Sequence, residues 1–175
     1  MKRPLIAANW KMYKTIPEAL TVVASIKAGV HKATECEIVI CPPFPALAAV
    51  GRALKGGPLE LGAQDMHPES EGAFTGEISP LMLKELGCRY VILGHSERRV
   101  HLHETDEFVN QKVRSALKFN LVPIVCIGET LQEREGNKTF DVIRTQFNES
   151  LAGFNKNDIE KIVIAISPLP SNQSI

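Results

Sequence analysis

The sequence predicts an α/β protein organised around a parallel sheet of about six strands. Short apolar runs rich in Val and Ile recur along the chain, at residues 5–8, 37–41, 59–63, 90–93, 122–127 and 162–166. Their apolar residues are nearly continuous rather than alternating, which is typical of strands buried on both faces. Amphipathic stretches separate the runs, and this alternation favours parallel strands joined by right-handed crossovers. Two architectures fit the pattern, a doubly wound open sheet and a closed barrel.

Five of the intervening stretches are predicted as helices because apolar residues recur in them every three or four positions. They cover residues 17–29, 46–54, 79–86, 105–117 and 140–151. Pro17 suits the first turn of a helix, which needs no backbone N–H, and Gly29 suits the end of the same helix. Residues 64–78 carry no helix signal and form a long polar connection, and connections of that length usually have a function.

The composition is that of an ordinary globular protein and argues against several functional classes. Hydrophobic residues make up 44% and charged residues 23%, and 20 basic residues balance 20 acidic ones. This balance gives no support for nucleic-acid binding, and no apolar run approaches the ~18 residues of a membrane span. The N-terminus lacks a secretory apolar segment, so we expect a cytoplasmic protein whose 175 residues form a single domain.

Neither a metal site nor a cofactor is predicted. The cysteines form no C-x-x-C pair and are expected to be reduced, mostly buried thiols: Cys36, Cys41, Cys88 and Cys126. Four histidines lack the spacing of metal ligands and are expected to be packed or surface residues: His31, His67, His101 and His103. The glycine-rich motifs that bind nucleotide phosphates do not occur either.

Polar residues follow the carboxyl ends of the predicted strands, where ligands bind in parallel α/β proteins. The candidates are Asn9 and Lys11 after the first strand, Gln64 and Asp65 after the third, His95 to Arg99 after the fourth, Glu129 after the fifth and Ser167 after the sixth. We expect Glu129 to be a turn residue or a buried acceptor for an arginine.

Lys11 and His95 carry the most chemical information among these residues. A lysine at a strand end can hold an anionic substrate or stabilise a developing oxyanion. His95 stands at a predicted helix start, where backbone N–H groups lower the pKa of an imidazole and keep it a neutral hydrogen-bond donor. The alternative for Lys11 is a solvated side chain, and for His95 a packed one. Residues 97–99 could likewise form a plain ion-pair cluster.

Six strings of residues, taken together, resemble the triosephosphate isomerase family in the order and spacing of that family, over residues 2–165. The strings are Ala7-Ala8-Asn9-Trp10-Lys11-Met12, Cys41-Pro42-Pro43-Phe44, Gly62-Ala63-Gln64-Asp65, Gly72-Ala73-Phe74-Thr75-Gly76-Glu77, Leu93-Gly94-His95-Ser96-Glu97-Arg98-Arg99 and Cys126-Ile127-Gly128-Glu129-Thr130-Leu131. Each string is moderately specific, and the ordered set is highly specific.

The resemblance implies a parallel (β/α)8 TIM barrel, here incomplete with about six strands and five helices. It implies an isomerase of glycolysis and gluconeogenesis that interconverts dihydroxyacetone phosphate and glyceraldehyde 3-phosphate without cofactor or metal. In that family pattern Lys11 holds the substrate and stabilises the enediolate, and His95 is the neutral electrophile. Asn9 contributes to the oxyanion site and to substrate binding, and Glu97 supports Lys11.

The resemblance also implies a homodimer. The connection over residues 64–78, with Gln64, Phe74, Thr75 and Gly76, corresponds to the family's loop that reaches into the partner subunit. Thr75 is then expected to approach the neighbouring active site.

The chain departs from the family pattern after the sixth strand. Ser167 stands where the family has its catalytic base, a glutamate, and residues 166–175 form a divergent tail. Strands seven and eight and their phosphate-binding loops have no counterpart in the sequence, whereas a complete barrel takes ~250 residues. We therefore expect a weak or inactive isomerase, with exposed sheet edges at strands one and six, apolar inner faces and marginal stability.

Two other interpretations compete with that expectation. The chain could be a non-catalytic binding or dimerisation module that keeps the loop over residues 64–78 and pairs with a full-length isomerase subunit. It could also be an unrelated open α/β domain, which would require a strand order that differs from that of a barrel.

Overall fold

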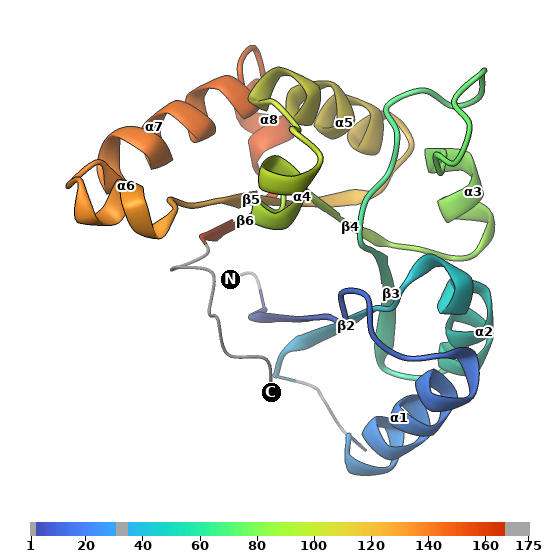
Figure 1. Ribbon diagram of the computed structural model, residues 1–175. Coiled ribbons are helices and arrows are strands. Elements are labelled where there is room, and N and C mark those ends of the chain that lie inside the picture. Colours follow the sequence, from blue (N-terminus) through green and yellow to red (C-terminus); the bar gives the residue numbers. More distant parts are fainter. Residues whose placement is uncertain (1–2, 31–34, 167–175) are drawn as a thin grey trace.

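The computed structural model describes residues 3–30 and 35–166, and these form a curled six-stranded parallel sheet (Figure 1). The strands are β1 (Leu5–Asn9), β2 (Glu37–Cys41), β3 (Leu59–Ala63), β4 (Tyr90–Leu93), β5 (Val122–Ile127) and β6 (Val163–Ile166). Each strand pairs in parallel with the next along the chain, in the order β1-β2-β3-β4-β5-β6. This order confirms the α/β prediction and is that of an incomplete barrel, because a doubly wound sheet would reverse its strand order.

Helices cover the outer side of the curled sheet (Figure 1). The five predicted helices are present as α1 (Ile16–Gly29), α2 (Phe44–Leu54), α3 (Pro80–Glu85), α5 (Asp106–Lys118) and α7 (Thr139–Ser150). Three short helices add to them: α4 (Ser96–His101), α6 (Leu131–Glu135) and α8 (Lys156–Ile159). Thr105 caps α5 as expected, since its hydroxyl accepts the N–H of Phe108 at 3.2 Å.

The apolar core has two parts, one on each face of the sheet. The larger part joins sheet residues such as Ile40 and Val91 to helix residues such as Leu47 and Val113. The smaller part lies on the inner face of the curl and consists of strand residues: Val39, Cys41, Tyr90, Ile92, Ile124 and Cys126. Burial on both faces explains why the strand sequences are continuously apolar.

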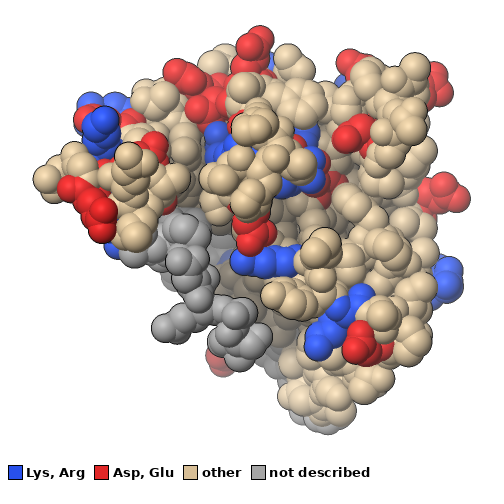
Figure 2. Space-filling view, viewed as in Figure 1, with Lys and Arg blue, Asp and Glu red and all other residues tan. Residues whose placement is uncertain are grey.

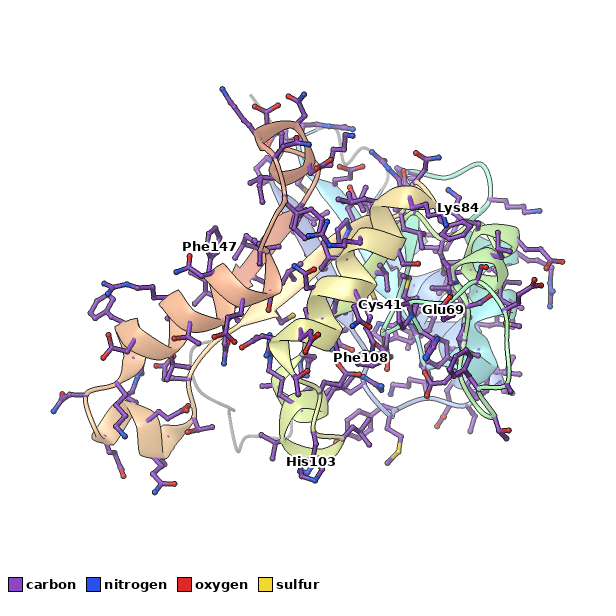
Figure 3. All side chains as sticks on the ribbon, turned by 90° about the horizontal axis from the view of Figure 1, so that it is seen from above. Cys41, Glu69, Lys84, His103, Phe108 and Phe147 are labelled. Atoms are coloured by element: carbon purple, nitrogen blue, oxygen red, sulfur yellow. The ribbon has the colours of Figure 1, made fainter. Side chains whose placement is uncertain are left out.

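The four cysteines are free, and three of them are buried: Cys41, Cys88 and Cys126. Figure 3 shows Cys41 inside the molecule and His103 at its periphery. Burial raises the pKa of the Cys41 and Cys88 thiols to about 12, so they are protonated and unreactive at neutral pH. The prediction of buried thiols is confirmed for these three, whereas Cys36 is partly exposed.

The two outer strands of the sheet have one partner each within residues 3–30 and 35–166. Their most exposed apolar side chains are Ile6, with 54% of its surface accessible, and Ile166, with 58%. Both pair with residues whose side chains point to the helices, Ile38 and Ile127. On the inner face, Leu5 and Val163 are partly buried. At the two sheet edges, more apolar surface is therefore exposed on the helix-facing side than on the inner side. The prediction from the sequence had been exposed edges with apolar inner faces.

Some predictions fall outside the described residues, namely those on His31, on Ser167 and on the tail beyond Ile166. Within the part that the structure does describe, no helix combines the length and apolar character needed to cross a membrane. Figure 2 shows Lys and Arg side chains interspersed with Asp and Glu side chains on the face that carries α4. This agrees with the zero net charge of the sequence.

Candidate active site

A cavity of about 370 Å³ opens at the carboxyl ends of the strands and brings together most of the predicted site residues. Asn9 and Lys11 reach it from the end of β1, Gln64 from the end of β3, and His95 and Glu97 from the end of β4 and the start of α4. Residues as far apart in the chain as Lys11 and Glu97, which are separated by 86 positions, therefore meet at the strand ends as predicted.

The ammonium group of Lys11 is held over the cavity by a carboxylate. Lys11 Nζ donates to Glu97 Oε1 at 2.8 Å, and both side chains are close to half exposed. The Lys11 backbone N–H donates to the Asn9 side-chain oxygen at 3.0 Å. Lys11 has a φ of +52°, a conformation that is uncommon for residues other than glycine and marks local strain. The turn after β1 thus presents the lysine at a defined place beside Asn9.

Gln64 holds this strained turn. Its side-chain nitrogen donates to the carbonyl oxygens of Lys11 and Cys41, each at 2.9 Å. One amide group therefore ties the turn after β1 to the end of β2. The position of Gln64 at a strand end and in the long connection was predicted, whereas its contact with the lysine backbone was not.

The His95 imidazole is arranged as a neutral hydrogen-bond donor. His95 is the N-cap of α4, and its Nδ1 accepts the backbone N–H of Glu97 at 3.3 Å. A neutral ring that accepts at Nδ1 carries its proton on Nε2. Burial lowers the pKa of His95 below the usual 6.5, and the charge of Lys11 acts in the same direction. The Glu97 carboxylate, 3.5 Å from Nδ1, opposes them without reversing the result.

Glu97 remains ionised at neutral pH. Burial by itself raises its pKa, but the hydrogen bond from Lys11 and the positive charge of Lys11 outweigh that effect, so the pKa is lowered. An ionised Glu97 keeps Lys11 in place and completes a pair of opposite charges beside the neutral His95.

A buried ionic cluster lies behind these residues. Lys112, on α5, is fully buried, and its Nζ donates to both Asp65 oxygens, at 2.8 and 2.9 Å, and to Glu104 at 2.5 Å. Arg98 also donates to Asp65, at 2.8 Å, and to Glu104, at 2.7 Å. The Lys112 ammonium also lies over the ring of Phe108, 4.7 Å from its centroid. Phe108 is in the first turn of α5 (Figure 3). The cluster connects the residue after Gln64 with the residue after Glu97.

The two carboxylates of the cluster differ in their titration. Burial raises the pKa of Asp65 to about 6, and the negative charge of Glu104 adds to that effect while Lys112 opposes it. For Glu104, burial also raises the pKa, but the hydrogen bonds from Lys112 and Arg98 lower it more, so that its pKa falls below 4.5. Glu104 Oε2 is buried without a hydrogen-bond partner. Asp65 is therefore the carboxyl of the cluster that takes up a proton first as the pH falls.

Residues 97–99 do not form a common ion-pair cluster, because each has a different partner. Glu97 binds Lys11, Arg98 binds Asp65 and Glu104, and Arg99 binds Asp106 at 2.6 Å. Glu129 is buried and accepts Arg134 Nε at 2.8 Å, which confirms its prediction as a buried acceptor for an arginine.

The connection over residues 64–78 is irregular, as predicted, and is anchored at its base. The His67 N–H donates to the Ile78 carbonyl at 2.8 Å, and the Ser115 hydroxyl donates to the Pro68 carbonyl. Residues 71–77 are exposed, including Phe74, whose ring packs on His67 with 4.0 Å between centroids. In this connection Gly76 has a φ of +91°, which other residues adopt with strain. The base is fixed and the tip faces solvent.

Across the described parts of the chain, no three side chains of His, Cys, Asp or Glu converge as a metal site would require. The cavity instead offers a cation, a neutral imidazole donor and an amide, from Lys11, His95 and Asn9. Such groups suit an anionic substrate with a carbonyl oxygen on which negative charge develops.

Comparison with known proteins agrees with this fold. The triosephosphate isomerase family model matches residues 4–171. The triosephosphate isomerase of Alkaliphilus oremlandii is 55% identical over 169 residues, which cover 97% of this chain and 68% of that protein. The corresponding enzyme of Caldanaerobacter subterraneus is 53% identical over the same coverage. The crystal structure of the Bartonella henselae triosephosphate isomerase superposes with a TM-score of 0.87 and 42% identity, covering 95% of this chain and 68% of that one.

Fold, strand-end site and comparisons together define a barrel-type α/β isomerase chain. The chain belongs to the triosephosphate isomerase family.

Proposed function

We propose that the cavity lined by Asn9, Lys11, His95 and Glu97 is the electrophilic half of a triosephosphate isomerase site. Its substrates are dihydroxyacetone phosphate and glyceraldehyde 3-phosphate, which interconvert through an enediolate. The observation that carries this proposal is the meeting of Lys11 and a neutral His95 in one cavity, with the imidazole proton on Nε2.

The chemistry follows from the charge that develops during the reaction. Removal of a proton next to the substrate carbonyl moves negative charge onto the carbonyl oxygen. His95 donates a hydrogen bond to that oxygen, and Lys11 balances the charge of the enediolate and of the phosphate. Glu97 keeps Lys11 in position through the 2.8 Å contact, and Asn9 fixes the lysine backbone.

The 175-residue polypeptide, assayed alone, is expected to be weak or inactive. At the position of the family's base it carries Ser167, and a serine hydroxyl does not remove a carbon-bound proton near neutral pH. The absence of a positioned base costs about 10²–10⁴-fold in rate. The six strands of the described residues also leave the curl open, whereas a TIM barrel closes with eight.

The test is an isomerase assay of the 175-residue chain, produced in a host that lacks its own isomerase. We expect Ser167→Glu to raise kcat/KM by about 10²–10⁴-fold over the parent chain and His95→Gln to remove that gain. A gain in Ser167→Glu that His95→Gln leaves intact would contradict the proposal. Parent activity that does not depend on His95 would contradict it as well.

A second function rests on the exposed apolar residues beside the site. Met12 is 95% exposed, Tyr13 61% and Phe74 45%. A cavity of about 580 Å³ lies at the first two of these residues and is lined by Met12, Tyr13, Pro43 and Pro45. We propose that this surface pairs with a second subunit of the family, either another copy of this chain or a full-length isomerase, with the loop tip around Thr75 and Gly76 reaching into that cavity.

Pairing is measured by sedimentation of the chain alone and by mixing it with a full-length isomerase. We expect a dimer that Phe74→Asp weakens by at least tenfold. The matched control is Phe140→Asp, because Phe140 is also exposed but lies on α7, away from this surface. A monomer under both conditions, or equal weakening by the two substitutions, would contradict the pairing.

A further inference from the structure

Arg99 touches the backbone on both sides of His95. Its side-chain Nε donates to the Gly94 carbonyl at 2.8 Å, and its backbone N–H donates to the His95 carbonyl at 3.1 Å. The Gly94 carbonyl belongs to the peptide group that joins Gly94 to His95, so its direction sets the orientation of that peptide plane.

The guanidinium of Arg99 is itself held from three further elements. Nη1 donates to Asp106, at the start of α5, at 2.6 Å. Nη2 donates to the Ser150 hydroxyl at 3.3 Å, at the end of α7, and contacts the Cys126 carbonyl of β5 at 3.5 Å. Ser150 is completely buried, and its hydroxyl also donates to Asp106 at 2.9 Å. Arg99 therefore connects the end of β4 to a fixed frame made by α5, α7 and β5.

The space around Gly94 is filled by the same arginine. Gly94 has a φ of +66°, and a Cβ placed there would lie 3.0 Å from Arg99 Nη2 and 3.0 Å from a Val109 methyl group. The turn between β4 and α4 is thus confined by its unusual backbone conformation, by the packing of Val109 and by the hydrogen bond from Arg99. Little room remains for the peptide group before His95 to rotate.

The orientation of that peptide group decides which way the imidazole faces. His95 Nδ1 accepts the Glu97 N–H at 3.3 Å, and this hydrogen bond keeps the proton on Nε2. If the peptide group before His95 rotates, Nδ1 moves away from the Glu97 N–H and the preference for the Nε2–H form is lost. A side chain that holds the Gly94 carbonyl therefore acts on the tautomer of His95 without touching the ring.

We infer that Arg99 is a positioning residue for His95, and that the frame formed by Arg99, Asp106 and Ser150 sets the Nε2–H tautomer of the imidazole. The geometry of the guanidinium rather than its charge explains this role, because Nε, Nη1 and Nη2 of Arg99 donate in three directions at once. A lysine keeps the charge but cannot donate in the fixed planar pattern of a guanidinium. The inference rests on the proposed role of His95, but its test does not require activity.

The test is nitrogen NMR of the ¹⁵N-histidine-labelled 175-residue chain between pH 5 and 8, with the His95 signals assigned by His95→Gln. In the parent chain we expect Nε2 protonated and Nδ1 unprotonated over most of this range. Arg99→Gln and Arg99→Lys should both shift the two signals toward a mixture of tautomers. They should also move the midpoint of the His95 titration up toward 6.5.

Two further variants separate positioning from general destabilisation. Arg114→Gln is the matched control. Arg114, on α5, likewise donates to a side chain and to a backbone carbonyl, those of Asn110 and Ala152, and it has no contact with Gly94 or His95 among its hydrogen bonds. It should leave the His95 signals unchanged. Asp106→Asn weakens the hold on the arginine without removing it. It should shift the His95 signals in the same direction by a smaller amount. If Arg99→Gln does not fold, the His95 signals of Asp106→Asn test the inference instead.

Unchanged His95 signals in a folded Arg99→Lys or Asp106→Asn chain would overturn the inference. Equal shifts in Arg114→Gln would also overturn it, because the effect would then be general loosening. Isomerase activity that does not depend on His95 contradicts the proposed function alone, and His95 signals that respond as expected still leave the positioning role of Arg99 in place.

Discussion

The fully buried ammonium of Lys112 donates to both carboxylate oxygens of Asp65, at 2.8 and 2.9 Å. Asp65 directly follows Gln64, which holds the Lys11 backbone, and Arg98, the other cation on Asp65, directly follows Glu97, which holds the Lys11 side chain. The interior ion pair thus supports both contacts that place the lysine in the cavity.

Lys112→Met removes the central cation of this cluster. Asp65 and Glu104 would then share one partner, Arg98, in a buried setting, and breaking such a pair from one side costs about 3–5 kcal/mol. We expect a loss of that size in the free energy of unfolding in urea. Lys118→Met on the exposed side of the same helix is the control and should change it by less than about 0.5 kcal/mol. A loss below about 1 kcal/mol for Lys112→Met would show that the cluster is not a stabilising centre.

Asp65 makes the stability of the fold depend on pH. Burial raises its pKa from 3.8 to about 6, so the folded chain binds this proton more tightly than the unfolded chain does. The resulting stabilisation is complete below about pH 4 and is lost as the pH rises through 6, up to about 3 kcal/mol. Urea unfolding of Asp65→Asn between pH 4 and 7 should show a flatter profile than the parent over this interval. The same slope in both chains would exclude Asp65 as its source.

Lys11→Met is expected to raise the pKa of His95. The lysine charge lowers that pKa, and without it the Glu97 carboxylate, which favours the protonated ring, is opposed by burial alone. A histidine NMR titration should show the His95 midpoint above that of the parent chain. Lys14→Met provides the comparison, because Lys14 is also in the segment after β1 but does not line the cavity with His95. A His95 midpoint that stays the same or falls in Lys11→Met would contradict this expectation.

Gln64→Leu removes the amide that donates to the carbonyls of Lys11 and Cys41. Two hydrogen bonds are lost and the strained Lys11 backbone loses its support, so we expect a loss of about 1–3 kcal/mol in unfolding free energy. The Lys11 and Trp10 amides should exchange with solvent at least tenfold faster. Gln132→Leu on the short helix α6 should leave this exchange unaffected. If these amides exchange at the same rate in Gln64→Leu as in the parent chain, the turn after β1 does not depend on the Gln64 side chain.

The strands could be predicted from the sequence because their residues are almost continuously apolar. Burial on both faces accounts for this in the inner strands, whereas the edge strands keep the pattern although Ile6 and Ile166 are exposed. The short helices α4, α6 and α8, of four to six residues, are too brief to show a helical period, so their number was underestimated. Lys112 lies between Val109 and Val113 on the inward face of α5. This position in the helix indicates that the lysine is buried, which the composition of the chain does not.

The site was predictable in its members and less so in its contacts. Strand ends gave Asn9, Lys11 and His95, because carboxyl ends of parallel strands meet at one edge of a sheet. Their roles came from the family resemblance. The contact of Gln64 with Lys11 and the frame around Arg99 depend on how the turns between elements bend in three dimensions, which neither periodicity nor spacing encodes.

The strand pairing has a consequence for how the cavity comes apart. Asn9 is the last residue of β1 and Lys11 lies in the turn that follows it. Within the described residues β1 pairs only with β2, whereas His95 follows β4, which has a strand on either side. Peripheral strands detach at a lower free energy than central ones. Fraying of β1 therefore dismantles the cationic side of the cavity while the imidazole side stays folded, and the lifetime of the assembled cavity is that of its outermost strand.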